Sequence, residues 1–231
     1  MRMGNVWDYI YPPRCPVCDG ISARGFCDAC RRELVYIRED YCLKCGKPLE
    51  GECEEYCADC KKRRHYFKQG RALFFYQGKL RPSLYRMKYA NRREYADVYG
   101  GEMAICLGGW IRRMGITKIV PIPLHASRKR KRGYNQAELL AKALGKCLEL
   151  PVDTELLCRV RKTAPQKKLT SRQRRDNLAG AFRMSGRIRP GEQILLVDDI
   201  YTTGNTADAA ARCLKLGGSC RVYVMSAAIG G

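Results

Sequence analysis

ILLVDDIYTTGNTA, residues 194–207, sets four apolar residues directly before two aspartates. Small hydroxyl residues and Gly204 follow the aspartates, and an alanine-rich helical pattern comes after them. A nearly continuous apolar run is typical of a strand in a sheet that is covered on both faces. The stretch therefore predicts a buried strand, a turn of small residues and the first turn of a helix.

Strand and helix patterns alternate through much of the remaining chain. Strands are expected at residues 70–78, 117–122, 181–185, 193–199 and 220–229, and helices from Pro82, within 94–113, around 137–144 and around 207–214. The alternation from Ile116 onward predicts an α/β domain with a mainly parallel sheet.

The two aspartates and the turn after them predict a ligand site. Ligands of open parallel sheets bind beyond the carboxyl ends of the strands, where Asp198 and Asp199 are expected. The free N–H groups and the dipole of a helix start can hold a phosphate, and a glycine lets the backbone approach it closely. The residues expected to do so are Thr202, Thr203, Gly204, Asn205 and Thr206. Because carboxylates accept hydrogen bonds from ribose-like hydroxyls, directly or through Mg²⁺, the pattern suits a sugar phosphate.

Two other interpretations of the acid pair are weaker. Adjacent acids after an apolar strand also occur in Walker-B motifs, but the chain contains no G-x4-G-K-[ST] segment to accompany one. The acids could instead only cap a helix, although the ordered run of Asp-Asp and Thr-Thr-Gly-x-Thr favours a ligand site.

Cysteine is unusually frequent: the chain has 14, and nine of them lie between Cys15 and Cys60. Eight of these nine form four C-x2-C pairs, and two such pairs complete a tetrahedral thiolate site for one zinc ion. The favoured grouping follows the chain, with Cys15, Cys18, Cys27 and Cys30 on one ion and Cys42, Cys45, Cys57 and Cys60 on a second. A crossed grouping and a disulfide framework are the alternatives, and Cys53 is left without a pair. Five later cysteines are expected to be buried small hydrophobic residues: Cys106, Cys147, Cys158, Cys213 and Cys220.

Zinc is favoured over disulfides because the first residues, MRMGNVWDYIYPPRCPVC, show no apolar export signal. No window approaches the apolar length of a transmembrane helix. We therefore expect a cytoplasmic protein without a transmembrane segment, whose first 60 residues are stabilised by metal.

Positive charge is also excessive and unevenly distributed, with a formal net charge of +21. No acid occurs from Cys60 to Arg93, a stretch with 12 lysines and arginines, and two further acid-free basic stretches follow at residues 128–133 and 156–175. We interpret the first of these, RKRKRG, as a basic loop. Such segregation favours attraction to nucleic acid, acidic lipid or a phosphate-rich ligand over a generic solvated surface.

ILLVDDIYTTGNT resembles the phosphoribosyl pyrophosphate (PRPP) motif of type I phosphoribosyltransferases. Three further segments resemble one branch of these proteins, the ComF family. They are the cysteine-rich ribbon after YPPRC, VPIPLHASRKRKRGYNQAELLA at residues 120–141 and RKTAPQKKLTSRQRRDNLAGAF at residues 161–182. The resemblance implies a type I phosphoribosyltransferase-like α/β core with a mainly parallel twisted sheet, behind a small N-terminal double zinc ribbon. It places the ribbon at residues 1–65 and the second domain at 66–231, with a hood at about 70–113 and the core at about 116–231.

The resemblance also implies roles for individual residues. Asp198 and Asp199 would hold the ribose of Mg²⁺-bound PRPP, and Thr202 to Thr206 its 5-phosphate. Pro121 and Ile122, with Arg128 or Arg132, would contact pyrophosphate. A mobile loop at residues 163–175 would close over the site. It carries four further candidates: Gln166, Lys167, Lys168 and Arg172. His125 could contact pyrophosphate or serve only as a cap.

Two functions of different class follow from the resemblance. In the first, the protein is a phosphoribosyltransferase of nucleoside metabolism whose acceptor is not a 6-oxopurine, because relatives that use one carry an acid where this chain has Thr202. In the second, it is a competence accessory that binds single-stranded DNA and a ComFA-type helicase and uses PRPP only as a ligand. Five tyrosines of the basic hood would then stack on bases, although packing of the hood against the sheet is the favoured explanation for them. They are Tyr76, Tyr85, Tyr89, Tyr95 and Tyr99.

Overall fold

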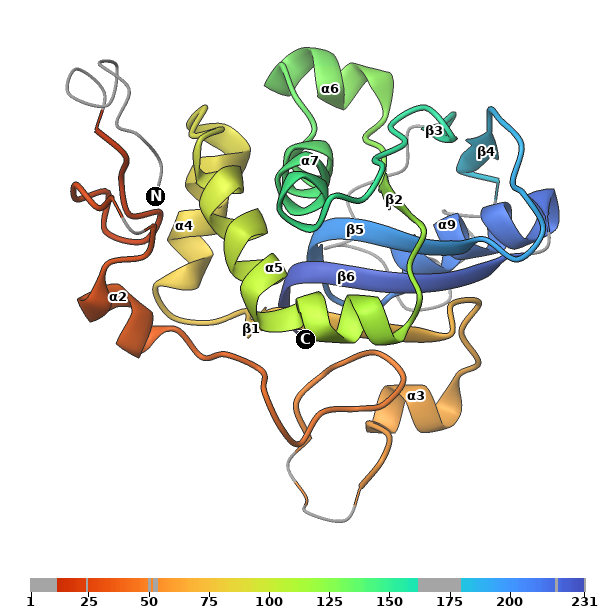
Figure 1. Cartoon of the computed structure of the whole chain (residues 1–231), viewed down its shortest axis with the longest axis horizontal. Coiled ribbons are helices and arrows are strands. Elements are labelled where there is room, and N and C mark those ends of the chain that lie inside the picture. The colour runs from red at the N-terminus through yellow and green to blue at the C-terminus, as the bar shows by residue number, and fades with distance from the viewer. Residues whose placement is uncertain are drawn as a thin grey trace.

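The computed structural model describes residues 12–23, 25–49, 51, 54–161, 180–218 and 220–230. Its centre is a parallel four-stranded sheet in the order β1–β6–β5–β2 (Figure 1). The strands are β1 (Gln69–Phe75), β6 (Arg221–Ile229), β5 (Gln193–Tyr201) and β2 (Lys118–Pro121). The expected parallel α/β domain is confirmed, and β1, which falls within the range expected for the hood, is an edge strand of this same sheet.

Helices cover both faces of the sheet (Figure 1). One face carries α4 (Leu80–Tyr89), α5 (Tyr95–Arg113) and α7 (Gln136–Leu148), and the other carries α9 (Asn205–Gly217). Side chains alternate along β5, so that Leu195 and Val197 pack in the core with α5 and α7, while Ile194 and Leu196 pack in the core with α9. This burial on both faces explains the unbroken apolar run before the aspartates.

The basic segment at residues 128–133 corrects one expectation, because it is helical rather than a loop. It belongs to α6 (Ala126–Arg132), which begins where the His125 side chain accepts a hydrogen bond from the backbone N–H of Ser127. The helix ends at Gly133, whose φ of 80° lies in the left-handed region that glycine adopts without strain. His125 therefore serves as a helix cap.

A second, two-stranded antiparallel sheet pairs β3 (Leu157–Arg159) with β4 (Phe182–Met184). The sequence pattern predicts β4 but not β3, which has only three residues. None of the helices in the described ranges is long and apolar enough to cross a membrane.

The cysteine-rich segment runs along the β1 side of the molecule (Figure 1). It contains two short helices, α2 (Asp28–Glu33) and α3 (Ala58–Lys62), each starting directly after the first cysteine of a C-x2-C pair. Backbone hydrogen bonds join this segment to β1: the N–H of Ile37 donates to Leu73 O at 3.0 Å, and that of Gly70 to Lys44 O at 2.7 Å. At Gly46, with φ of 79°, a Cβ atom would lie 2.8 Å from the backbone of Arg71, so only glycine fits this close approach.

Candidate phosphate-binding site and zinc centres

The eight cysteines of the four C-x2-C pairs form two separate clusters of four. In each cluster the sulfur atoms all lie within 4.8 Å of one another, and the grouping is the sequential one. Cys18 Sγ lies 3.8 Å from Cys27 Sγ, and Cys45 Sγ lies 3.7 Å from Cys57 Sγ. Zn–S bonds of about 2.3 Å in a tetrahedron require sulfur–sulfur distances of about 3.8 Å, so both clusters fit a zinc ion.

One thiol of each cluster has a lowered pKa, whereas the pKa of Cys18, Cys30, Cys45 and Cys60 is raised, and none of the cysteines in the described part of the chain forms a disulfide. Hydrogen bonds from the thiols of Cys45 and Cys60 lower the pKa of Cys42, outweighing the opposite effect of burial. In the first cluster, burial acts to raise the pKa of Cys15, but hydrogen bonds from backbone N–H groups together lower it to about 7. A bound zinc ion would hold all four sulfurs of a cluster ionised, including those whose pKa is raised without it.

None of the five later cysteines is fully buried, which corrects the expectation from the sequence. Cys106 and Cys147 are exposed, and Cys158, Cys213 and Cys220 are half-buried. Cys106 and Cys147 lie on the solvent-facing sides of α5 and α7, because the buried stripes of these helices are supplied by other residues.

Asp198 and Asp199 lie near the carboxyl end of β5, as the apolar run before them predicts. Asp199 is buried, and its Oδ2 atom accepts from the ammonium of Lys88 on α4 at 2.9 Å. Burial and the neighbouring charge of Asp199 raise the pKa of Asp198 to about 7. Burial alone would lower the pKa of Lys88, but the Asp199 carboxylate more than compensates and raises it.

The turn after the acids brings the expected phosphate-binding residues together. Gly204 is the N-cap residue of α9 with φ of 71°, and a Cβ atom there would overlap the Tyr201 hydroxyl. The Oγ1 atom of Thr203 is buried without a hydrogen-bond partner, and Asn205 is buried in the first turn of the helix. A narrow hollow is lined by residues 200–207 together with Asp198 and Val224. The arrangement can bind an anion through its backbone N–H groups and hydroxyls.

The residues expected to contact pyrophosphate lie on the neighbouring strand. Pro121 pairs with Val197 in the register of β2 and β5, and the backbone N–H of Ile122 donates to Val197 O at 2.9 Å. Arg132 instead turns toward α4 and α7, donating to the Tyr89 hydroxyl at 3.0 Å and to Gln136 Oε1 at 2.8 Å.

Arg159 is half-buried, and burial is the largest cause of its lowered pKa. The nearby charge of Arg128 in α6 lowers this pKa further, whereas the charge of Asp198 acts to raise it. The basic residues around the acids thus include Arg159 of β3, for which no motif in the sequence predicts a role. The expected mobile loop at 163–175 lies outside the described residues, as do Gln166, Lys167, Lys168, Arg172 and the odd cysteine, Cys53.

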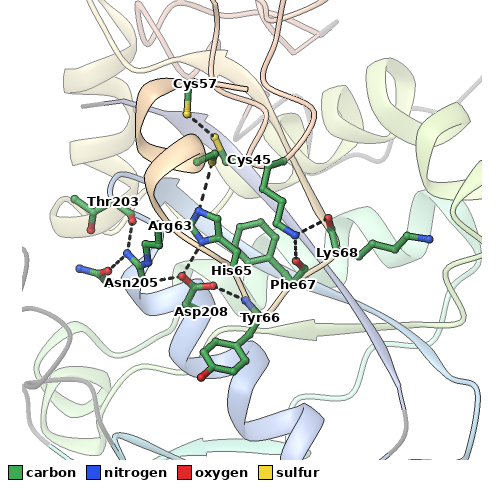
Figure 2. Close-up of polar contacts among 12 residues, drawn as sticks. Cys45, Cys57, Arg63, His65, Tyr66, Phe67, Lys68, Thr203, Asn205 and Asp208 are labelled. Carbon is green, nitrogen blue, oxygen red and sulfur yellow. Dashed lines mark hydrogen bonds and ion pairs between the residues drawn. The ribbon is translucent and has the colours of Figure 1, made fainter. Parts of the chain in front are cut away.

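The segment just after the second cluster also contacts the start of α9, next to the phosphate-type turn (Figure 2). Asp208 of α9 accepts from Arg63 Nη2 at 2.6 Å, from His65 Nδ1 at 2.7 Å and from the backbone N–H of Tyr66 at 3.0 Å. A basic residue within a run of lysines and arginines gives no sequence signal for such a contact. The position of His65, five residues after Cys60, is the one available hint.

These observations define the class of protein: a parallel α/β domain with acids and a phosphate-type turn at one strand end, joined to a ribbon with two four-cysteine clusters. Residues 6–61 match the family described as "Double zinc ribbon domain". The DNA utilization protein YhgH of Escherichia coli K12 is 30% identical over 203 residues, covering 87% of this chain and 88% of that protein. Competence protein ComFC of Bacillus subtilis 168 is 30% identical over 192 residues, covering 81% of this chain and 77% of that protein.

Competence protein F of Haemophilus influenzae is 28% identical over 210 residues, covering 87% of this chain and 90% of that protein. The chain belongs to the ComF family, as its motifs indicate. Among solved structures it is similar to the adenine phosphoribosyltransferase of Leishmania donovani, with 14% identity and a TM-score of 0.32 over 69% of this chain and 60% of that one. It is also similar to the adenine phosphoribosyltransferase of Leishmania tarentolae, with 11% identity and a TM-score of 0.33 over 77% of this chain and 89% of that one.

Proposed function

We propose that this ComF-family protein binds PRPP together with Mg²⁺ and acts as a phosphoribosyltransferase-like protein linked to competence and DNA uptake. The observation that carries the proposal is the pairing of Asp198 and Asp199 at the end of β5 with a turn that opens α9 at Gly204. One strand end thus supplies acceptors for ribose hydroxyls and, within the next few residues, donors for a phosphate. The names of the relatives support the link to DNA uptake.

The ligand would lie across the carboxyl end of the sheet. Its 5-phosphate would accept from Thr202, Thr203 and the N–H groups of residues 204–206, and its ribose hydroxyls would donate to Asp198 and Asp199. The pyrophosphate would lie toward Pro121 and Ile122, with Arg128 and Lys168 as candidates to balance its charge, and Arg132 could join them only by leaving Tyr89 and Gln136. Lys88 keeps the buried carboxylate of Asp199 ion-paired, so the ribose site is electrically balanced before a ligand arrives.

Transfer of the phosphoribosyl group breaks the bond between the anomeric carbon and the pyrophosphate oxygen and forms one to the acceptor. Mg²⁺ would stabilise the negative charge that develops on pyrophosphate. The chain's own contribution is to hold both ends of the ligand, to place carboxylates beside the cationic ribose and to supply basic side chains to the leaving group. The threonine at position 202 favours an acceptor other than a 6-oxopurine.

The test is a calorimetric titration of the full zinc-loaded chain with PRPP and Mg²⁺. Asp198→Asn combined with Asp199→Asn should abolish detectable binding while the circular dichroism spectrum stays that of the wild type. Asp97→Asn combined with Asp153→Asn removes the same charge elsewhere on the surface and should bind normally. Unchanged affinity in the first double variant would refute the assignment. A screen for pyrophosphate release over candidate acceptors then separates a transferase from a protein that uses PRPP only as a ligand.

A second function, binding of single-stranded DNA in the cytoplasm beside a ComFA-type helicase, is favoured by one surface feature. Tyr85 and Tyr89 of α4 are 61% and 58% exposed, and their rings lie 4.7 Å apart. The guanidinium of Arg132 lies 4.7 Å from the centre of the Tyr89 ring, so the pair is both aromatic and cationic. Tyr95 and Tyr99 are fully buried and serve packing instead. An exposed aromatic pair beside basic groups can stack on bases without regard to sequence.

A salt series with a single-stranded oligonucleotide tests this second function. Affinity should fall steeply with salt, because each neutralised phosphate releases counterions. Tyr85→Ala with Tyr89→Ala should weaken binding, as should neutral replacements of the four basic residues at 61–64, and saturating PRPP should leave binding intact. Tyr56→Ala, at an exposed tyrosine outside the acid-free basic stretch of residues 60–93, is the control. Absence of binding at low salt would discard the idea, and full displacement by PRPP would mean that DNA occupies the phosphate site.

A further inference from the structure

We infer that the second four-cysteine cluster (Cys42, Cys45, Cys57 and Cys60) holds the phosphate-binding turn in position through a chain of buried side chains, so that zinc and a phosphate ligand stabilise each other's sites. The connecting side chains are those of His65, Asp208 and Arg63, which act as positioning residues (Figure 2). The identity of the ligand rests on the proposed function. The connection between zinc and the turn does not.

The first link joins the cluster to His65. Its Nε2 atom lies 3.4 Å from Cys60 Sγ, and its ring is stacked on Phe67 with centroids 4.7 Å apart. The imidazole is only 2% exposed, so it has no solvent position to swing into. With a proton on each ring nitrogen, His65 can donate to a zinc-bound sulfur through Nε2 and to Asp208 through Nδ1, and such a bond is a common way for an outer residue to fix a metal ligand.

The second link joins His65 to the start of α9. Asp208 is 5% exposed and is surrounded by donors that all come from the segment after the cluster: His65, Arg63 and the backbone of Tyr66. The backbone N–H of Asp208 in turn donates to Gly204 O at 2.8 Å, in the phosphate-binding turn itself. Because α9 is rigid over one turn, the position of the carboxylate fixes the position of Gly204.

The third link returns from Arg63 to the turn. The guanidinium that pairs with Asp208 also donates to the Asn205 side-chain oxygen and, at 3.3 Å, to Thr203 O. A cavity of about 290 Å³ between the cluster and the turn is lined by both, including Cys60, Arg63 and Thr203. One arginine of the ribbon therefore orients the carbonyl and amide groups of two residues that would surround the phosphate.

The three side chains depend on one another energetically. A buried carboxylate that loses one partner is strongly destabilised, because its desolvation is no longer offset. Helix α3 has five residues, too few to be stable without the metal that ties Cys57 and Cys60 to Cys42 and Cys45. Loss of zinc would release Arg63 and His65, and with them the orientation of Asn205 and Asp208.

The first cluster provides an internal comparison, since its segment contacts different elements. Ser83 and Arg86 of α4 donate to Pro16 O at 2.5 Å and 2.9 Å, and the Tyr95 hydroxyl of α5 donates to Asp19 at 2.6 Å. These contacts tie the first segment to α4 and α5, whereas Arg63, His65 and the backbone of Tyr66 tie the second to the start of α9. The two zinc ions are therefore expected to respond differently to changes at α9.

The first experiment measures zinc release and needs no phosphate ligand. Zinc transfer from the full chain to a chromogenic chelator is followed in a Cys18→Ser, Cys27→Ser background, which keeps only the second cluster. Asp208→Asn should speed release at least tenfold, whereas Asp153→Asn, which removes a half-buried carboxylate paired with Lys118, should not. Equal rates in all three proteins would overturn the inference. Arg63→Ala, with rescue by Arg63→Lys, gives the same test if Asp208→Asn does not fold.

The second experiment measures the reverse effect. PRPP with Mg²⁺ should slow zinc release from the second cluster at least threefold and leave the first cluster, isolated by Cys57→Ser and Cys60→Ser, unchanged. Arg63→Ala should weaken PRPP binding at least tenfold, and Lys62→Ala, the same charge loss one residue earlier, less than twofold. If the wild type binds no PRPP, the proposed function fails, and the first experiment by itself then tests the connection between zinc and the turn. If PRPP binds but does not change the rate of zinc release, the coupling between the two sites is refuted and the proposed function stands.

Discussion

The ammonium of Lys88 lies 2.9 Å from Oδ2 of Asp199 and so ties the C-terminal part of α4 to the end of β5. The two residues are far apart in the sequence, and both side chains are largely buried, with 19% and 12% exposure. A buried pair of this kind is costly to break from one side only, because the remaining charge is left without a partner. The contact therefore connects the stability of the fold to the electrostatic balance of the candidate ribose site.

Lys88→Met should lower the free energy of unfolding by about 3 kcal/mol, since it strands the Asp199 carboxylate. Adding Asp199→Asn should recover most of this loss, and a double-mutant cycle from urea unfolding measures the coupling. Lys129→Met, which breaks the more exposed pair with Glu138, should cost less than about 1 kcal/mol. Additive effects of the two changes at Lys88 and Asp199 would contradict the prediction.

Stability should depend on pH through Asp198. Its pKa is raised to about 7 in the folded protein, against about 3.9 in an unfolded chain. The folded state then binds the proton more tightly, so the stabilisation is complete below about pH 4 and is lost as the pH rises through about 7. Asp198→Asn, which stays neutral, should melt several degrees above the wild type at pH 8, and this advantage should vanish toward pH 4. Asp97→Asn, at an exposed site, is the control, and a constant difference across the range would count against the shift.

Gly204 should not tolerate a side chain. Gly204→Ala combines a positive φ with overlap of the Tyr201 hydroxyl, so it should lose stability and any phosphate binding at the turn. Gly191→Ala is a matched control, because Gly191 has φ of 82° but open space around its Cβ position. We expect about 1 kcal/mol of strain at Gly191 and clearly more at Gly204, measured by chemical denaturation. Equal losses at both positions would show that the contact with Tyr201 is unimportant.

The purified, reduced chain should contain two zinc ions, one for each four-cysteine cluster. Cys57→Ser with Cys60→Ser should remove one ion and destabilise the second ribbon, while the parallel sheet stays largely folded because most residues of its two cores come from strands and helices outside the ribbon. Elemental analysis counts the ions, and far-ultraviolet circular dichroism follows the sheet. Less than one zinc per wild-type chain would rule out the two-site assignment.

Local sequence patterns predict much of the fold. The apolar run at residues 194–197 predicts a strand covered on both faces, and the structure confirms it. The spacing of the C-x2-C pairs predicts two tetrahedral sites, and only the structure excludes the crossed grouping. The basic run in α6 is misinterpreted as a loop, since the cap at His125 and the stop at Gly133 matter more than the charge of the residues between them.

The sequence by itself determined the parallel α/β core, the two metal clusters and the acids followed by a phosphate-type turn, because the pattern that predicts each of them lies in residues close together in the chain. Only the tertiary structure decided which distant side chains complete these features. Lys88 reaches Asp199 because α4 lies against the end of β5, and Arg63 and His65 reach Asp208 because the second ribbon ends beside α9. A lysine or arginine in a basic run has the same local pattern whether it faces solvent or a buried carboxylate, so its partner is set by packing alone.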